Sequence, residues 1–184
     1  MRFQDAVSFA YSKDWPLTTA ITVSWDALKQ AGERNEGHCL GMASWDRERY
    51  LRKELARLCR SRGLPFAAIW GRDVGRVIGA HVHLSLFYPS WRLAELVTLI
   101  ELLTGSLADF VQTPYVAPLV ARSVCGGWRI DMNCRDKEGA LSWADYICEQ
   151  HDKHPDIPEL KGKAFGVSVA IGHAAQKRAG WGEY

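Results

Sequence analysis

One short run of residues, 81–86, constrains the fold more than any other part of the chain. Polar and apolar side chains alternate strictly along it, which predicts a β-strand because successive side chains of a strand point to opposite faces. One face would carry His81, His83 and Ser85. The other face is apolar and can enter a hydrophobic core. It carries Val82, Leu84 and Leu86.

Two histidines side by side on a strand can hold one divalent metal ion through neutral imidazole nitrogens. The alternative is that His81 and His83 only face solvent or fill polar positions of the core. A metal held by two imidazoles favours a third, harder ligand, and Asp73 is the nearest candidate, on the neighbouring strand or at its turn. An ordinary turn aspartate is the alternative reading of Asp73.

The composition is that of one soluble globular domain spanning residues 1–184, with its core at about 17–180. The chain is 47% hydrophobic and 24% charged, and its formal net charge of +2 permits nucleic-acid binding without arguing for it. Five cysteines without a Cys-x-x-Cys pair indicate a reduced compartment. Without a signal-like N-terminus or a long apolar stretch, we expect a cytoplasmic protein that does not contact the membrane.

Periodicity along the chain predicts an α+β fold. Besides the histidine strand, strands are predicted at residues 17–25, 66–71, 128–132 and within 160–170. Helices are predicted at residues 44–60, 91–103 and 137–150, and residues 26–43 are predicted to form a loop. The expected architecture is an antiparallel sheet of about five strands, with a central hairpin carrying the histidine pair. Helices would pack on one face, and the face with the histidines would be open.

A tyrosine on the third predicted helix is a candidate nucleophile. Helical spacing places Tyr146 on a stripe with Trp143, away from the apolar stripe, so that it can project toward a neighbouring site. A phenol is a weak nucleophile at neutral pH because its pKa is about 10, and a nearby cation lowers that cost. A packing role is the alternative for Tyr146. Tyr88 and Tyr115 are the fallback nucleophiles.

These parts, taken in order along the chain, resemble the HUH endonucleases. The matching segments are the threonine-rich strand at residues 21–24, the His-hydrophobic-His motif at residues 81–83 and the helical Tyr146. The resemblance covers roughly residues 17–180 and is best for the rolling-circle replication initiators (Rep proteins) of bacterial plasmids and phages. It implies the RRM-like fold of the Rep endonucleases. The chain departs from the family in having Asp73 where glutamate is frequent, and in having its first lysine after the tyrosine two turns away, at Lys153.

The resemblance implies a site- and strand-specific endonuclease that nicks and joins single-stranded or hairpin origin DNA. It implies that His81, His83 and Asp73 bind Mg²⁺ or Mn²⁺, and that Tyr146, accompanied by Lys153, forms a 5′-phosphotyrosine intermediate. No organic cofactor is expected. Because the chain lacks a phosphate-binding Gly-x-x-x-x-Gly-Lys-Ser/Thr segment, a host helicase and a host polymerase are the expected partners.

Three other functions remain open at this level. The first is a non-catalytic nucleic-acid-binding module on the same scaffold. The second is a metal-dependent hydrolase that uses water as its nucleophile, with Tyr146 in a structural role. The third is a single-tyrosine transposase or relaxase with the same chemistry.

Overall fold

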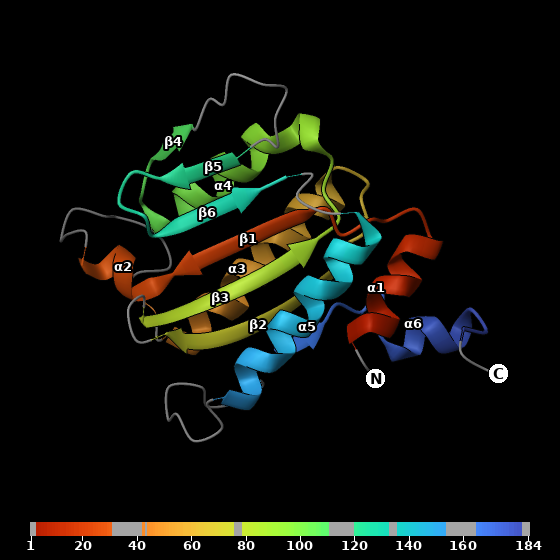
Figure 1. Ribbon diagram of the computed structural model, residues 1–184. Coiled ribbons are helices and arrows are strands. Elements are labelled where there is room, and N and C mark those ends of the chain that lie inside the picture. The colour runs from red at the N-terminus through yellow and green to blue at the C-terminus, as the bar shows by residue number, and fades with distance from the viewer. Residues whose placement is uncertain are drawn as a thin grey trace.

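The structure is a computed structural model that describes residues 3–30, 42, 44–75, 79–110, 120–132, 136–153 and 165–181. Within these ranges the chain forms one seven-stranded sheet in the order β4-β5-β6-β1-β3-β2-β7 (Figure 1). All paired neighbours are antiparallel. The predicted α+β class with an antiparallel sheet is confirmed, whereas the expected number of about five strands was too low.

The strands that were predicted from alternation are present, and β4 and β5 are additional. The bounds are β1 (Thr19–Ser24), β2 (Ala68–Gly75), β3 (Gly79–Leu86), β4 (Ala108–Phe110), β5 (Val120–Ser123), β6 (Trp128–Asp131) and β7 (Phe165–Val167). β2 and β3 form the predicted hairpin, in which Asp73 lies opposite His81. β3 is flanked by β1 and β2, so the histidine strand is hydrogen-bonded on both sides.

The helices in the described ranges are α1 (Phe3–Ser12), α2 (Trp25–Gln30), α3 (Ser44–Ser61), α4 (Leu93–Thr104), α5 (Lys137–Lys153) and α6 (His173–Arg178), with a 3₁₀ turn η1 (Ser90–Arg92) before α4. The prediction of a loop from residue 26 was wrong for its first part, because α2 follows β1 directly. The predicted stop of α4 is confirmed: Gly105 adopts a left-handed conformation with φ of 68° and its N–H binds the Glu101 carbonyl. None of the described helices is long and apolar enough to cross a membrane.

Helices cover both faces of the sheet, so the prediction that they lie on one face was wrong. Figure 1 shows α3 and α4 behind the sheet and α5 crossing in front of β2 and β3, with α1 beside it. The apolar stripe of α5 explains this arrangement, because Ala144 and Ile147 must be removed from water and they pack with Ile69 of β2. The face that carries the histidine pair is therefore partly covered.

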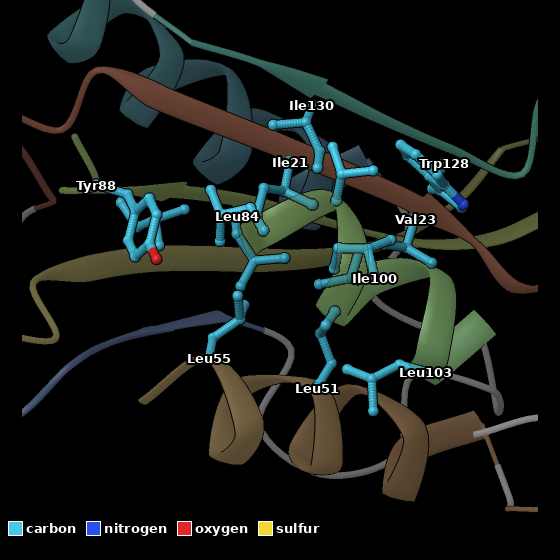
Figure 2. Close-up of a cluster of buried hydrophobic side chains, with 14 of the residues drawn as sticks. Ile21, Val23, Leu51, Leu55, Leu84, Tyr88, Ile100, Leu103, Trp128 and Ile130 are labelled. Carbon is cyan, nitrogen blue, oxygen red and sulfur yellow. The ribbon is translucent and has the colours of Figure 1, made fainter. Parts of the chain in front are cut away.

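The larger core lies between the sheet and the helices α3 and α4 (Figure 2). The inward side chains of β1 and β3 alternate as predicted, and Leu51 and Leu55 of α3, one turn apart, pack against them. The main members drawn in Figure 2 are Ile21, Val23, Leu51, Leu55, Leu84, Tyr88, Ile100, Leu103, Trp128 and Ile130. This core anchors the strands whose opposite faces carry the candidate site.

A second, smaller core fills the space between the sheet, α1 and α5. Phe3 and Val7 of α1 pack in the same cluster as Ala144 and Ile147 of α5 and Ile69 of β2. The cluster does not extend along the whole face. Further along β2 and β3, the side chains that face α5 are polar. The two histidines and Asp73 lie in this part of the sheet.

Candidate active site

His81 and His83 lie on the α5 side of β3 and are both buried, at 4% and 6% exposure. Their ring centroids are 4.7 Å apart, with the rings at 84° to each other. Because β3 is an interior strand, the two imidazoles stand on a rigid platform. The predicted pairing of these histidines on one face is therefore confirmed, although the face is buried under α5 instead of open.

A main-chain contact determines which nitrogen of His81 carries hydrogen. Its Nδ1 lies 2.8 Å from the carbonyl oxygen of Gly79, and a carbonyl only accepts, so Nδ1 is the donor. Nε2 lies 3.5 Å from Oδ2 of Asp73. When Nε2 is unprotonated, two lone-pair-bearing atoms face each other, an arrangement that a cation between them would stabilise. When Nε2 carries a proton instead, the imidazolium and the Asp73 carboxylate form an ion pair.

His83 is held by Thr22, its direct neighbour on β1. The Thr22 hydroxyl lies 3.0 Å from Nδ1 of His83. Nε2 is buried and has no hydrogen-bond partner among the described residues. Burial, and after it the nearby His81, lower the pKa of His83 to about 3. The ring is thus neutral at physiological pH and carries an orphaned polar atom, a combination that suits a metal ligand.

Asp73 is buried at 6% exposure, in register with His81 on the adjoining strand. Its Oδ1 accepts a hydrogen bond from the N–H of Val74 at 2.7 Å, which leaves Oδ2 directed at His81. The prediction that this aspartate reaches the histidine face is confirmed. The hairpin register achieves this, because residues directly opposite on antiparallel strands share a face.

Tyr146 lies on α5 above the histidines. Its ring centroid is 5.5 Å from that of His83, at an interplanar angle of 73°. Trp143 stacks on the tyrosine at 5.0 Å and 14°, and it also meets the edge of His83 at 5.3 Å. The three rings thus form a triangle in which each ring contacts the other two. With 38% of its surface exposed, Tyr146 remains accessible from solvent.

Electrostatics in this arrangement disfavour the phenolate. Burial raises the pKa of Tyr146, and the negative charge of Asp73 raises it further. The effect of the Asp73 charge means that the phenol of Tyr146 and this carboxylate are close enough to interact electrostatically. A cation near Asp73 would cancel that contribution, so the phenol and a bound metal ion would favour each other.

Gly71 explains how α5 comes so close to the sheet. It lies opposite His83 on β2, and a Cβ added there would overlap Cγ2 of Ile147. The missing side chain allows the helix to approach, which brings Tyr146, the preceding residue, over the imidazole. Sequence reasoning assigned no role in the site to Gly71, Thr22 or Trp143. Gly71 was the last residue of the predicted strand 66–71, where a glycine indicates a turn, and only the extension of β2 to Gly75 places it inside the strand.

The remaining predicted site residues lie elsewhere or outside the described part. Lys153 is the last residue of α5, and its side chain lies outside the described residues, as does all of Tyr115. Tyr88 packs in the α3/α4 core, and its hydroxyl donates to Oε2 of Glu95 at 2.9 Å. Burial and then this hydrogen bond raise its pKa well above the ordinary value. The suggestion of Tyr88 as a fallback nucleophile was therefore wrong.

The types of donor atom in this cluster suit a divalent metal ion, but the positions of the side chains do not yet form a coordination site. Two imidazoles and one carboxylate are neighbours, and each imidazole has its Nδ1 engaged, which leaves Nε2 as the available donor. Among the described residues, however, no three His, Cys, Asp or Glu side chains form a group already arranged to hold a metal ion. The chemistry of the donors therefore supports a metal site, but ready-made coordination does not.

No protein-family model, curated protein or solved structure matches this chain. The interpretation of the site therefore depends on its own residues and their geometry.

Proposed function

We propose that this chain is an endonuclease that nicks and rejoins single-stranded DNA through a tyrosine nucleophile and a divalent metal ion, as rolling-circle replication initiators of the HUH type do. The observation that carries the proposal is the contact of Tyr146 with His83, a buried neutral imidazole whose Nε2 has no partner in the described part of the chain. His81 and Asp73 adjoin it and complete the set of donors.

His81, His83 and Asp73 would hold Mg²⁺ or Mn²⁺, and the bound ion would offset negative charge on the scissile phosphate. The protein keeps these ligands oriented. Gly79 accepts from Nδ1 of His81, and Thr22 bonds Nδ1 of His83, so both rings turn Nε2 away from their own supports. Burial keeps His83 neutral, the form in which imidazole binds metals.

In the proposed nicking step, Oη of Tyr146 bonds to phosphorus and the phenol gives up its proton. The bond from phosphorus to the 3′ oxygen breaks, and that oxygen takes up a proton. The products are a 5′-phosphotyrosine and a free 3′-hydroxyl. Attack by a 3′-hydroxyl in the reverse sense joins the strand. Because each step exchanges one phosphoester for another, no ATP is required.

The substrate and partners follow from the same proposal. The exposure of Tyr146 would allow a single strand, or a strand extruded from an origin hairpin, to reach its hydroxyl. The free 3′-hydroxyl would prime a host polymerase, and a host helicase would unwind the duplex. Lys153 as a second catalytic residue stays a prediction, and Lys153→Ala would test it.

The test is covalent capture of DNA. Random-sequence single-stranded oligonucleotides are incubated with the protein and Mn²⁺, and protein-bound DNA is recovered under denaturing conditions and amplified until one sequence dominates. That sequence is then labelled at either end. A 5′-phosphotyrosine retains the 3′ fragment, so the 3′ label should migrate with the protein and the 5′ label should not. Tyr146→Phe and His83→Ala should abolish the adduct, while Tyr50→Phe, a tyrosine on α3 at the opposite face, should form it normally.

Each other outcome would assign a different function. An adduct that survives in Tyr146→Phe contradicts the choice of nucleophile. Cleavage without any adduct, retained in Tyr146→Phe, indicates a metal-dependent hydrolase that uses water. DNA binding without cleavage indicates the non-catalytic binding module, for which the absence of ready-made coordination among the described residues is the favouring observation.

A further inference from the structure

A pocket of about 450 Å³ lies on the α3 side of the sheet, at the edge formed by β2 and β7. It is separated from the histidine cluster by β2 itself, because Trp70 faces the pocket while Gly71 and Asp73 face α5. Its volume falls within the range of roughly 300–1,000 Å³ that is typical of small-molecule sites. The pocket therefore has the size of a ligand site and does not belong to the DNA-processing site.

The indole of Trp70 forms a fixed wall of this pocket. It lies close against β7, where a Cβ added to Gly166 would overlap the ring carbons. From the α3 side, the guanidinium of Arg52 lies over the same ring, 4.1 Å from its centroid. The connection between α3 and β2 supplies the other apolar wall, with Leu64, Pro65 and Phe66.

The charged groups of the pocket that belong to described residues are all positive. Arg52 and Arg60 lie two turns apart on α3 and both line the pocket, whereas no aspartate or glutamate of the described ranges lines it. Arg60 is exposed and forms no ion pair within the described ranges. Arg52 pairs with Glu48 at 2.6 Å, but the same carboxylate also faces Arg72 at 3.2 Å. The Glu48 carboxylate thus faces two guanidiniums, and Arg60 adds a further positive charge to the described part of the lining.

We propose that this pocket binds a small organic anion, with an apolar or aromatic body against Phe66 and Trp70 and its carboxylate or phosphate group on Arg60 and Arg52. Planar guanidinium groups suit both kinds of oxyanion because they donate two parallel hydrogen bonds. The apolar walls select against a free inorganic ion, since they offer it no partners. The inference does not depend on the proposed DNA chemistry.

The test is a titration of ¹⁵N-labelled protein with three probes: indole-3-acetate, its neutral analogue indole-3-acetamide, and phenyl phosphate. The indole N–H signal of Trp70, assigned with Trp70→Phe, reports occupancy. Indole-3-acetate should bind at least tenfold more tightly than the amide, because a hydrogen bond to a charged group carries that much discrimination. The phosphate probe shows whether a phosphate ester is preferred to a carboxylate.

Two variants and a matched control locate the binding. Arg60→Ala should weaken indole-3-acetate binding about tenfold, by loss of one charge-assisted contact. Arg57→Ala, on the same helix but paired with Glu54 and not part of the pocket lining, should leave it unchanged. Ala56→Phe should fill the pocket and abolish the Trp70 shift for every probe. The ¹H–¹⁵N spectrum of each variant shows whether it is folded. If Ala56→Phe does not fold, the comparison of Arg60→Ala with Arg57→Ala remains the test.

Three results would overturn the proposal. Equal affinity for the acid and the amide would show that the arginines do not recognise the anion. Equal weakening by Arg57→Ala and Arg60→Ala would reduce the effect to general surface charge. Absence of a Trp70 shift with all three probes would show that the pocket takes no ligand of this class.

Discussion

The two faces of β3 are equally buried but chemically opposite. Val82, Leu84 and Leu86 are fully buried under α3 and α4, while His81 and His83, on the other face, are nearly as inaccessible under α5. Burial alone therefore does not distinguish a core from a site. The difference lies in hydrogen bonding, because the apolar face needs no partners and the polar face contains an imidazole nitrogen without one in the described part of the chain.

This difference has an energetic meaning. Removing apolar side chains from water stabilises the fold by roughly 25 cal/mol per Å². Burying a polar atom without a partner costs about 1–3 kcal/mol. The α5 face therefore gives up stability at the histidine pair, and the α1/α5 cluster beside it offsets that cost. A local cost of this kind, offset elsewhere in the fold, is typical of functional sites.

The largest expected effect is a difference in the free energy of unfolding between substitutions on the two faces of β3. Leu84→Ala should lower the free energy of unfolding by about 2–5 kcal/mol, because it leaves a cavity in the main core. The double variant Thr22→Val/His83→Leu removes both partners of a part-buried hydrogen bond together with the unpartnered Nε2, and should leave the free energy of unfolding unchanged or raise it. Urea unfolding measures both. A loss in the double variant as large as that of Leu84→Ala would show that the polar face is a structural core.

Metal binding should stabilise the polar face. At a Mn²⁺ concentration of about 100 times Kd, the folded state gains about 2.7 kcal/mol, seen as a rise in Tm. His81→Ala/His83→Ala should show no rise. His173→Ala, an exposed histidine on α6, serves as the control and should behave like the unaltered protein. A rise of the same size in all three proteins would mean that the ion binds elsewhere.

The close approach of α5 to β2 should tolerate no added side chain. Gly71→Ala introduces a Cβ that overlaps Ile147, and we expect a loss of about 1–3 kcal/mol from overpacking. The second substitution Ile147→Ala should cost less in the Gly71→Ala background than alone, because it removes the overlap. Urea unfolding of the four proteins of this cycle measures the coupling. Simple additivity would contradict the contact.

The smallest expected effect is a difference in reactivity between two cysteines, which reports whether solvent reaches the core on the apolar face of the sheet. Burial raises the pKa of the Cys59 thiol to about 11. Burial also raises that of Cys125, but hydrogen bonds with Ser106, Ser123 and the backbone outweigh it, so its pKa lies below the ordinary value. At pH 8 iodoacetamide should therefore modify Cys125 well before Cys59, because the thiolate is the reactive form. Peptide mass spectrometry gives both rates, and rapid labelling of Cys59 would show that the core opens.

Much of the local structure was predictable because its cause is local. Alternation predicted β1, β3 and β6, and the hairpin of β2 and β3 was predicted with Asp73 on the strand beside His81 or at the turn; the register decided for the strand. The helix α2 was missed because its six residues directly after a strand carry too little periodicity. The strands β4 and β5 were missed because they lie within residues 106–126, where the sequence shows no clear periodicity.

Sequence by itself determined which side chains share a face of each strand, because that depends only on the two-residue period of the backbone. It also placed His81 and His83 on one face and offered Asp73 as the nearest candidate for a third ligand. Only the tertiary structure decided what covers them. The packing of α5 on Gly71 brings Tyr146 and Trp143 over His83, and Thr22 reaches the same ring from β1. These contacts join residues 60 or more positions apart, and no local pattern carries that information.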